Sequence, residues 1–292
     1  MGGVLADFCL GLHAGTDILR AVEIPRGIER LPSGCFMNCH TLVSATFESG
    51  SRLTKTGWAA FDGAGLRSFV CPRNVKIVEE RCFSDCASLT SFTFEAGSQL
   101  ERVEEHAFAG SSLSTICIPA SVWELGGRCF LECRSLASVT FETGSHLTSV
   151  EAYAFCDCSV LQTVTLPASV TMLGEHCFTS CSALISITCE TGAHLASIEA
   201  YTFYYCSALQ KVTLPASVRT FEEHCFAFCP SLLSVTCEAG SPPAEIGEGV
   251  FAGSPQARFV FPHDGERGGG LSPLFLKWEE APASCVLGNL LG

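Results

Sequence analysis

Positive charge is scarce in this chain. Lys and Arg together number 17 among 292 residues, against 30 Asp and Glu, which gives a formal net charge of −13. Binding to phosphate backbones without sequence preference requires clustered Lys and Arg, and so does binding to an anionic membrane surface. The composition therefore argues against a nucleic-acid partner and favours an acidic, soluble protein.

Long hydrophobic runs are also missing. No stretch approaches the roughly 18 uninterrupted apolar residues of a membrane helix, so we expect no transmembrane segment. The first 19 residues contain no Lys or Arg, and Gly and Asp interrupt their apolar positions, which is a poor match to a secretory signal. On this basis we expect a cytoplasmic location, unless the sequence is a piece of a longer protein.

Short motifs that carry catalysis are absent as well. The sequence has no glycine-rich phosphate loop, no G-x-S-x-G elbow and no H-E-x-x-H pair. We therefore expect no enzymatic activity and no cofactor. An enzyme would need a polar site that breaks the repeat described next, and only the C-terminal tail lies outside that repeat.

An internal repeat dominates what is present. Phenylalanine recurs at steps that alternate between 25 and 22 or 23 residues, and leucine and proline recur in phase with it. The Phe positions are Phe36, Phe61, Phe83, Phe108, Phe130, Phe155, Phe178, Phe203, Phe226 and Phe251. A fixed period of this length is the signature of a solenoid, in which each unit buries its apolar side only against its neighbours.

One unit shows how a single turn is built. In the segment Leu161-Gln-Thr-Val-Thr-Leu166 the last two apolar residues alternate with period two, as a strand with one buried face requires. Pro167 suits the strand end because proline has no N–H to donate to a ladder. Residues 175–181 are too few for a free helix, so we expect one helical or 3₁₀ turn that directs Phe178 into the core.

The repeated pattern C-F-x-x-C-x-x-L-x-x-V-x-[LF]-P-x-S-V closely resembles the BspA-like class of leucine-rich repeats, over residues 8–262. The resemblance implies a right-handed leucine-rich-repeat solenoid of about eleven turns, with a parallel β-sheet on one face and short strands and helical or 3₁₀ turns on the other. It also implies a surface location for many members, which adhere to host or matrix proteins. A cell-surface adhesin, or a fragment of one, is therefore the alternative to a cytoplasmic protein.

The domain organisation follows from the extent of the repeat. We expect one leucine-rich-repeat domain at residues 1–262, with irregular capping units at both ends. Residues 263–292 form a tail without the repeat, beginning with a glycine run. Residues 271–278 could fold back over the open edge of the last turn, and a disordered tail is the alternative.

Cysteine is abundant, and its 19 copies cannot all pair internally because the number is odd. Five C-F-x-x-C units stand out: Cys35/Cys39, Cys82/Cys86, Cys129/Cys133, Cys177/Cys181 and Cys225/Cys229. Zinc sites use such spacing, but other turns carry Ala or Ser at the same positions, as a small core slot allows. We therefore predict core packing. Disulfides between neighbouring turns remain open, since stacked Cys133, Cys158, Cys181, Cys206 and Cys229 would lie within bridging distance.

Two polar series could suggest chemistry. His106, His176 and His224 each follow a Glu, but the same slot carries Arg in other turns, so we predict solvated surface positions rather than acid–base catalysts. A glutamate series recurs only on every second turn, too far apart for neighbours to share a calcium ion. We expect these glutamates to form turns through local hydrogen bonds. They are Glu48, Glu95, Glu142, Glu190 and Glu238.

The outward side of the predicted sheet is rich in Ser and Thr. These residues suit strands and can pair across them, but together they also form a broad, weakly charged docking face. A regular lattice of hydroxyls is likewise a feature of ice-binding solenoids. The candidate partner-binding residues are Ser91, Thr93, Ser138, Thr140, Thr163, Thr165, Ser186, Thr188, Thr213 and Thr236.

The sequence thus predicts a non-enzymatic scaffold that binds one or more protein partners through this Ser/Thr-rich face and the edge loops. It predicts no catalytic residue, no metal and no nucleic-acid partner. It does not identify the protein partner.

Overall fold

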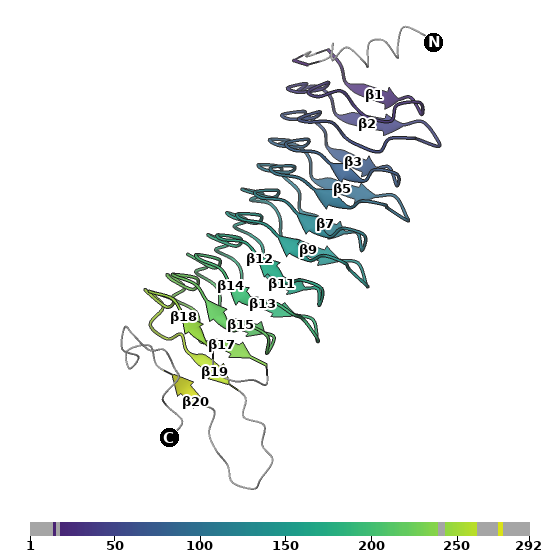
Figure 1. Ribbon diagram of the computed structural model, residues 1–292. Coiled ribbons are helices and arrows are strands. Elements are labelled where there is room, and N and C mark those ends of the chain that lie inside the picture. Colours follow the sequence, from purple (N-terminus) through teal and green to yellow (C-terminus); the bar gives the residue numbers. More distant parts are fainter. Residues whose placement is uncertain (1–13, 16–17, 239–242, 262–273, 277–292) are drawn as a thin grey trace.

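The computed structural model describes residues 14–15, 18–238, 243–261 and 274–276. Its turns are stacked one on another into a single coil, with the longer strands aligned along one side (Figure 1). The turns contact each other through parallel strand pairs. This arrangement is the β-solenoid that the repeat predicts.

Eleven strands form the front of the solenoid. They are β1 (Ala21–Ile24), β2 (Ser44–Phe47), β3 (Ser68–Cys71), β5 (Ser91–Phe94), β7 (Thr115–Ile118), β9 (Ser138–Phe141), β11 (Thr163–Leu166), β13 (Ser186–Cys189), β15 (Lys211–Leu214), β17 (Ser234–Cys237) and β19 (Phe259–Phe261). β1 pairs with β2, and the strands from β3 to β19 form one parallel sheet in chain order. Each strand therefore lies beside the strands of the preceding and following turns.

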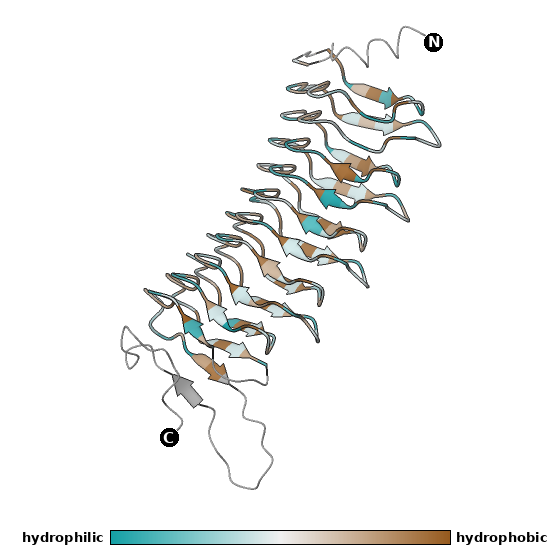
Figure 2. Cartoon of the chain, viewed as in Figure 1, coloured by the Kyte–Doolittle hydropathy of each residue, from teal (hydrophilic) through white to brown (hydrophobic). Residues whose placement is uncertain are grey.

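Register within this sheet places equivalent residues side by side. Val164 pairs with Ile187, and Thr165 pairs with Thr188. Inward residues such as Val164 are buried, whereas Thr165 is exposed. The resulting alternation of apolar and polar residues along the front strands is visible in Figure 2. A one-residue slip would move every apolar side chain to solvent, so the repeat fixes the register.

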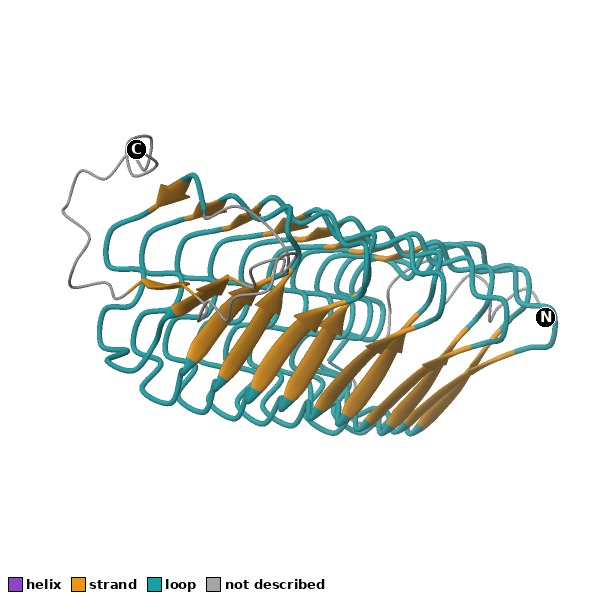
Figure 3. Cartoon of the chain, turned by 90° about the horizontal axis from the view of Figure 1, so that it is seen from below, coloured by secondary structure: helices purple, strands orange, loops and turns teal. Residues whose placement is uncertain are grey.

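Shorter strands line the opposite side, as predicted (Figure 3). They are β4 (Ile77–Val78), β6 (Arg102–Val103), β8 (Glu124–Leu125), β10 (Ser149–Val150), β12 (Met172–Leu173), β14 (Ser197–Ile198), β16 (Thr220–Phe221) and β18 (Glu245–Ile246). Their second residues are mostly buried and face the front strands across the core. From the turn of β3 to that of β17, each turn thus has a front strand, a loop, a back strand and a corner that contains the regularly spaced Phe. The first two turns have single β-bridges, at Arg30 and Lys55, in place of a back strand.

The corner corrects one expectation, because the described residues contain no helix. Residues two before and two after each Phe have left-handed backbone angles, as at His176 (φ 56°) and Ser180 (φ 60°). The N–H groups of Thr179 and Cys181 donate to carbonyls three residues earlier, as a 3₁₀ turn requires. Those of His176, Phe178 and Ser180 instead donate to the next turn. The left-handed residues prevent helical winding and turn the corner into a third ladder between turns.

The core is a column of stacked phenylalanine rings. Phe130, Phe155, Phe178 and Phe203 are all at most 1% exposed. Their ring centroids are separated by 5.2, 5.3 and 5.6 Å from one turn to the next, with nearly parallel planes. This spacing lies within the range of favourable aromatic pairs. The Phe period in the sequence is therefore the period of the core.

Cysteines fill the space beside this column, which confirms their prediction as core residues. The thiol of Cys181 donates to the carbonyl oxygen of Phe155 in the preceding turn, at a Sγ–O distance of 3.1 Å. Cys133 and Cys206 make the same contact with Phe108 and Phe178. Burial raises the pKa of the Cys133 thiol to about 12. The slot suits a small apolar group with one weak donor.

The glutamate series has a structural role, but the hydrogen bonds are not local as predicted. The Glu142 carboxylate accepts the backbone N–H of Ala120 at 3.0 Å, across 22 residues. Glu48, Glu95 and Glu190 make the same bond to the preceding turn. In every case the donor directly follows a proline that ends the previous front strand. Each of these four glutamates therefore joins two turns.

The C-terminal edge of the front sheet receives one further strand. β20 (Leu274–Leu276) pairs antiparallel with β19, with Val260 opposite Phe275. These three residues fall within the segment 271–278 that was predicted to fold back over the last turn. The remainder of the predicted tail, and most of the first capping unit, lie outside the described residues. Within the described part of the chain, no helix has the length and hydrophobicity of a membrane span.

Candidate interaction surfaces

The first candidate surface is the outer side of the front sheet, here called the hydroxyl face. It consists of the ten predicted Ser and Thr residues on strands β5 to β17. The structure brings all of them to one side, in two columns that follow the solenoid axis. Ser91, Thr93, Thr140, Thr163 and Thr165 are exposed, and the other five are half-buried.

Hydroxyls on this face are close enough to interact across strands. The Oγ1 atoms of Thr165 and Thr188 are 3.2 Å apart, within hydrogen-bond distance. Val70 and Cys117 take the place of Thr on β3 and β7, and Val70 is 53% exposed. The face therefore offers donors and acceptors in a regular array, which these two less polar positions and the exposed Lys211 on β15 interrupt.

The second candidate surface is the corner edge, where the histidines lie. The three histidines occupy the slot two residues before Phe, and the structure shows that they are half-buried rather than fully solvated. For His176 and His224 the reason is stacking between turns. His176 lies between Tyr153 and Tyr201, with ring centroids 4.5 and 4.7 Å away and planes within 6° of parallel. His224 stacks on the other side of Tyr201 at 5.2 Å.

Sequence reasoning missed this column because it compared the histidine slot with arginines and not with the intervening turns. Tyr153 and Tyr201 occupy that slot in the turns between the histidines. Arg128 precedes them, and its guanidinium carbon lies 4.8 Å from the centroid of the Tyr153 ring. The inner column, as we call it, therefore runs from Arg128 through Tyr153, His176 and Tyr201 to His224.

Burial shifts the pKa of His176 and of His106 in the same direction. Partial burial lowers the pKa of His176, although the adjacent Glu175 carboxylate opposes the shift. Partial burial also lowers the pKa of His106; Glu105 opposes this, and the guanidinium of Arg81 reinforces it. Both imidazoles are therefore predominantly neutral at neutral pH.

A second column, here called the outer column, is formed by the residues two positions after each Phe. Tyr205 and Phe228 stack there at a centroid distance of 4.8 Å and an interplanar angle of 12°. Tyr204 stands nearly perpendicular to both and also contacts Tyr201 of the inner column at 5.2 Å. Tyr204 thereby joins the two columns. We call the seven residues together the aromatic corner: Tyr153, His176, Tyr201, Tyr204, Tyr205, His224 and Phe228.

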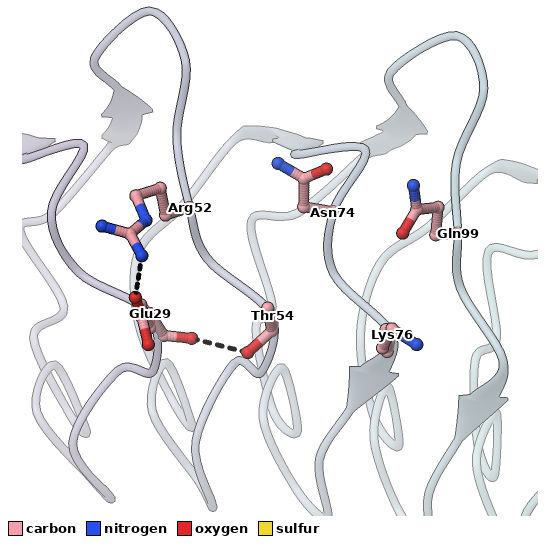
Figure 4. Close-up of a pocket in the computed structure, with 6 residues that line it drawn as sticks. All are labelled: Glu29, Arg52, Thr54, Asn74, Lys76 and Gln99. Carbon is pink, nitrogen blue, oxygen red and sulfur yellow. Dashed lines mark hydrogen bonds and ion pairs between the residues drawn. The ribbon is translucent and has the colours of Figure 1, made fainter.

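Polar depressions occur on the back of the solenoid, but they are shallow. In Figure 4 the Arg52 side chain reaches the Glu29 carboxylate, and the Thr54 hydroxyl meets the Glu29 backbone carbonyl. Asn74 donates to the backbone carbonyl of Ser51 at 2.8 Å. Most of these groups are thus engaged with neighbouring turns.

A second depression is lined by acidic side chains from successive turns. Glu80, Glu104, Glu124 and Glu151 surround Gly126 and Gly127. Glu105 at its rim pairs with Arg128 at 3.0 Å. These depressions hold carboxylates beside cross-turn ion pairs, and the residues of the hydroxyl face are not among their linings.

Comparison with known proteins places the repeat in a family. The sequence matches the BspA type leucine rich repeat region, in six copies, over residues 12–137 and 124–258. A comparison with curated protein sequences gave no significant match. These two matched segments together cover most of the chain.

Several solved structures of bacterial proteins are similar to this chain at low sequence identity. The pneumococcal vaccine antigen PcpA is 22% identical with a TM-score of 0.51, covering 82% of this chain and 68% of its own. A leucine-rich cell surface protein from Faecalibacterium prausnitzii is 23% identical with a TM-score of 0.43, covering 86% and 80%. A leucine-rich repeat protein from Eubacterium ventriosum is 18% identical with a TM-score of 0.48, covering 80% and 82%. The six matched copies extend over most of the chain and show that it belongs to the BspA-type leucine-rich repeat family.

Proposed function

We propose that this protein is a non-enzymatic scaffold that binds other proteins through the hydroxyl face and the edge loops. The observation that carries the proposal is the alignment of ten Ser and Thr side chains on one side of the front sheet, half-buried or fully exposed. A Ser or Thr hydroxyl both donates and accepts hydrogen bonds. Such an array can satisfy the polar groups of a partner surface without burying a charge.

The matched segments support a repeat scaffold over most of the chain. The polar groups described above recur from turn to turn and bind neighbouring turns, as the glutamate series does. A catalytic site would require a convergent cluster that breaks this regularity. The proposal therefore assigns recognition, not catalysis, to the exposed repeat positions.

The test substitutes three Thr residues at the centre of the hydroxyl face. The triple variant T140K/T165K/T188K places three bulky cations on adjacent strands, and we expect it to lose the partner that a photo-crosslinker at Thr163 captures. The matched control, T148K/T171K/A196K, adds the same charge at exposed positions on the back. Capture that survives in the front variant, or that both variants lose equally, would contradict the proposal.

A surface adhesin is the second candidate function, and the family resemblance suggests it. The structural neighbour PcpA is described as a vaccine antigen, and its similarity to this chain is one of fold. The two candidates differ in compartment and hence in thiol state. Quantifying thiols after rapid alkylation in the source cells separates them: reduced Cys181 and Cys206 favour the interior, and oxidation of these residues favours export.

A further inference from the structure

The aromatic corner is a surface that the repeat alone does not require. Tyr205 and Phe228 expose 49% and 39% of their surface, although other turns carry Gly or Ser in the same column. Exposed aromatic clusters are typical of surfaces that contact a partner. The question is which partner chemistry fits.

Charge around the aromatic corner indicates a cationic partner. Residues 135–257 include 11 Asp and Glu but only 2 basic residues, Lys211 and Arg219. Glu175, Glu223 and Glu248 are exposed. They directly precede the inner-column slot in three of the four consecutive turns that begin with the turn of His176. A negative surface of this kind attracts a basic segment and orients it during association.

The chain itself shows how this edge holds an arginine. The Arg128 guanidinium lies over the Tyr153 ring of the next turn at 4.8 Å. Its Nη1 atom is 3.0 Å from the Glu105 carboxylate of the preceding turn. A carboxylate on one side and a ring face on the other thus enclose one guanidinium within the inner column.

The outer column has the same two groups, a carboxylate and a ring face, without an arginine between them. Asp157, Ser180 and Tyr205 occupy the same position in three successive turns, and Ser180 has only a short side chain. Phe228 covers one face of the Tyr205 ring, and Tyr204 stands edge-on beside the pair. The other face of the Tyr205 ring is directed toward the turn of Ser180 and, beyond it, Asp157.

Other residues of this column show where the Asp157 side chain lies. The Asp85 carboxylate and the Phe228 ring each lie against the equivalent glycine of the following turn, within 2.7 Å of where a Cβ atom would stand. Side chains in the outer column therefore lean toward the next turn. A side chain that leans in this way brings the Asp157 carboxylate, whose Oδ2 atom also accepts the Cys156 thiol at 3.6 Å, beside the position of Ser180.

We propose that the Asp157–Ser180–Tyr205 position binds an arginine side chain from a basic segment of a partner protein. The guanidinium stacks on the Tyr205 ring and pairs with the Asp157 carboxylate, while the exposed glutamates attract neighbouring cations. Arginine fits better than lysine because its planar group stacks and pairs at once. The inference rests on the proposed function as a protein-binding scaffold, but it concerns a different surface.

The test uses a fluorescent peptide of alternating glycine and arginine, with fluorescence anisotropy as the readout. The variant S180R supplies the guanidinium from the chain itself, and the left-handed backbone there is the one that Arg128 already adopts (φ 56°). We expect S180R to weaken peptide binding about tenfold, which corresponds to about 1.4 kcal/mol. D157N and Y205A are expected to weaken it as well, and a lysine peptide should bind less tightly than the arginine peptide.

Matched variants distinguish a specific arginine site from general charge attraction. Q210R adds the same charge at an exposed loop position and should change the affinity less than twofold. T140K/T165K/T188K alters the hydroxyl face and should retain peptide binding, so failure of the proposed function and failure of this site are distinguishable. Equal losses in S180R and Q210R would overturn the proposal in favour of non-specific charge attraction, and so would unchanged binding in S180R, D157N and Y205A.

Discussion

The two halves of the solenoid share one backbone but differ in what their edges carry. Residues 18–134 contain 12 basic and 13 acidic residues, and seven ion pairs between Lys or Arg and Asp or Glu lie between Glu29 and Arg134. Residues 135–257 are strongly acidic, and stacked rings take the place of the ion pairs along the corner. Arg128 stands at the boundary, paired with Glu105 on one side and stacked on Tyr153 on the other.

The comparison teaches that the interior and the edge of this solenoid are under different physical constraints. Every turn must supply one Phe and one small residue to a continuous core. The corner slots need only tolerate a left-handed backbone, and Gly, Arg, His and Tyr all occupy them. Differences that distinguish the two halves therefore concentrate at exposed slots, where a partner can detect them.

The largest effect should come from the interior and should be equal in both halves. F178A removes a fully buried ring stacked between Phe155 and Phe203. We expect a loss of about 3–5 kcal/mol in the free energy of unfolding, measured by urea denaturation. F130A is the counterpart in the first half. A cost that differed by more than about twofold between the two variants would break the equivalence of the two interiors.

The next largest loss of stability should differ between the corner edges of the two halves. Y201A removes a ring that stacks on His176 and His224 and contacts Tyr204, and we expect a loss of about 1–3 kcal/mol. H106A removes the equivalent side chain in the first half, which neighbours charged groups instead of rings. It should cost about 1 kcal/mol or less. A larger cost for H106A would show that the charged edge is the more stabilising of the two.

Salt dependence provides a smaller but sharper contrast. E105Q breaks the exposed pairing with Arg128 and the contact with His106. It should cost about 0.5 kcal/mol at low salt, and thermal unfolding at high salt should show almost none of this loss. The cost of Y201A should not change with salt, because ring stacking involves no net charge. If salt reduced the stability loss of both variants equally, the distinction between a charged edge and a stacked edge would be refuted.

The smallest effect concerns protonation. Burial lowers the pKa of His176 in the folded protein, so protonation favours the unfolded chain. The stabilising contribution of the neutral ring is therefore complete above the unfolded value of about 6.5 and is lost as the pH falls below it. Thermal unfolding between neutral and mildly acidic pH should show a smaller decrease in H176Q than in the wild type. An equal decrease in both would assign the acid sensitivity to other groups.

Much of the fold was predictable because the same pattern of buried and exposed residues recurs in every turn of the repeat. The Phe period located the core, and the alternation around Val164 fixed which Thr side chains face outward. The left-handed corner was missed although the sequence contained a signal for it. Gly34 and Gly63 occupy the two slots in early turns, and glycine is the residue that adopts such angles at least cost.

The edges were harder to predict because their contacts join residues about 23 apart that share no obvious pattern. Tyr and His alternate from turn to turn at Tyr153, His176 and Tyr201, so a search for identical residues in neighbouring turns does not group them. Stacking between turns does group them, since planar rings fit one another whatever their chemistry. Partner preference depends on such exposed side chains, and one sequence does not reveal which of them a partner contacts.

The bond from each glutamate to the preceding turn has a consequence for how such a protein can change length. Glu142 requires the N–H that follows Pro119, and Glu190 requires the one that follows Pro167. A proline turn and the glutamate turn after it therefore form one indivisible module. Insertions or deletions of whole modules leave every carboxylate with its donor. Removal of a single turn leaves either a carboxylate or an N–H group without its partner, so both natural lengthening and engineering of this scaffold should proceed two turns at a time.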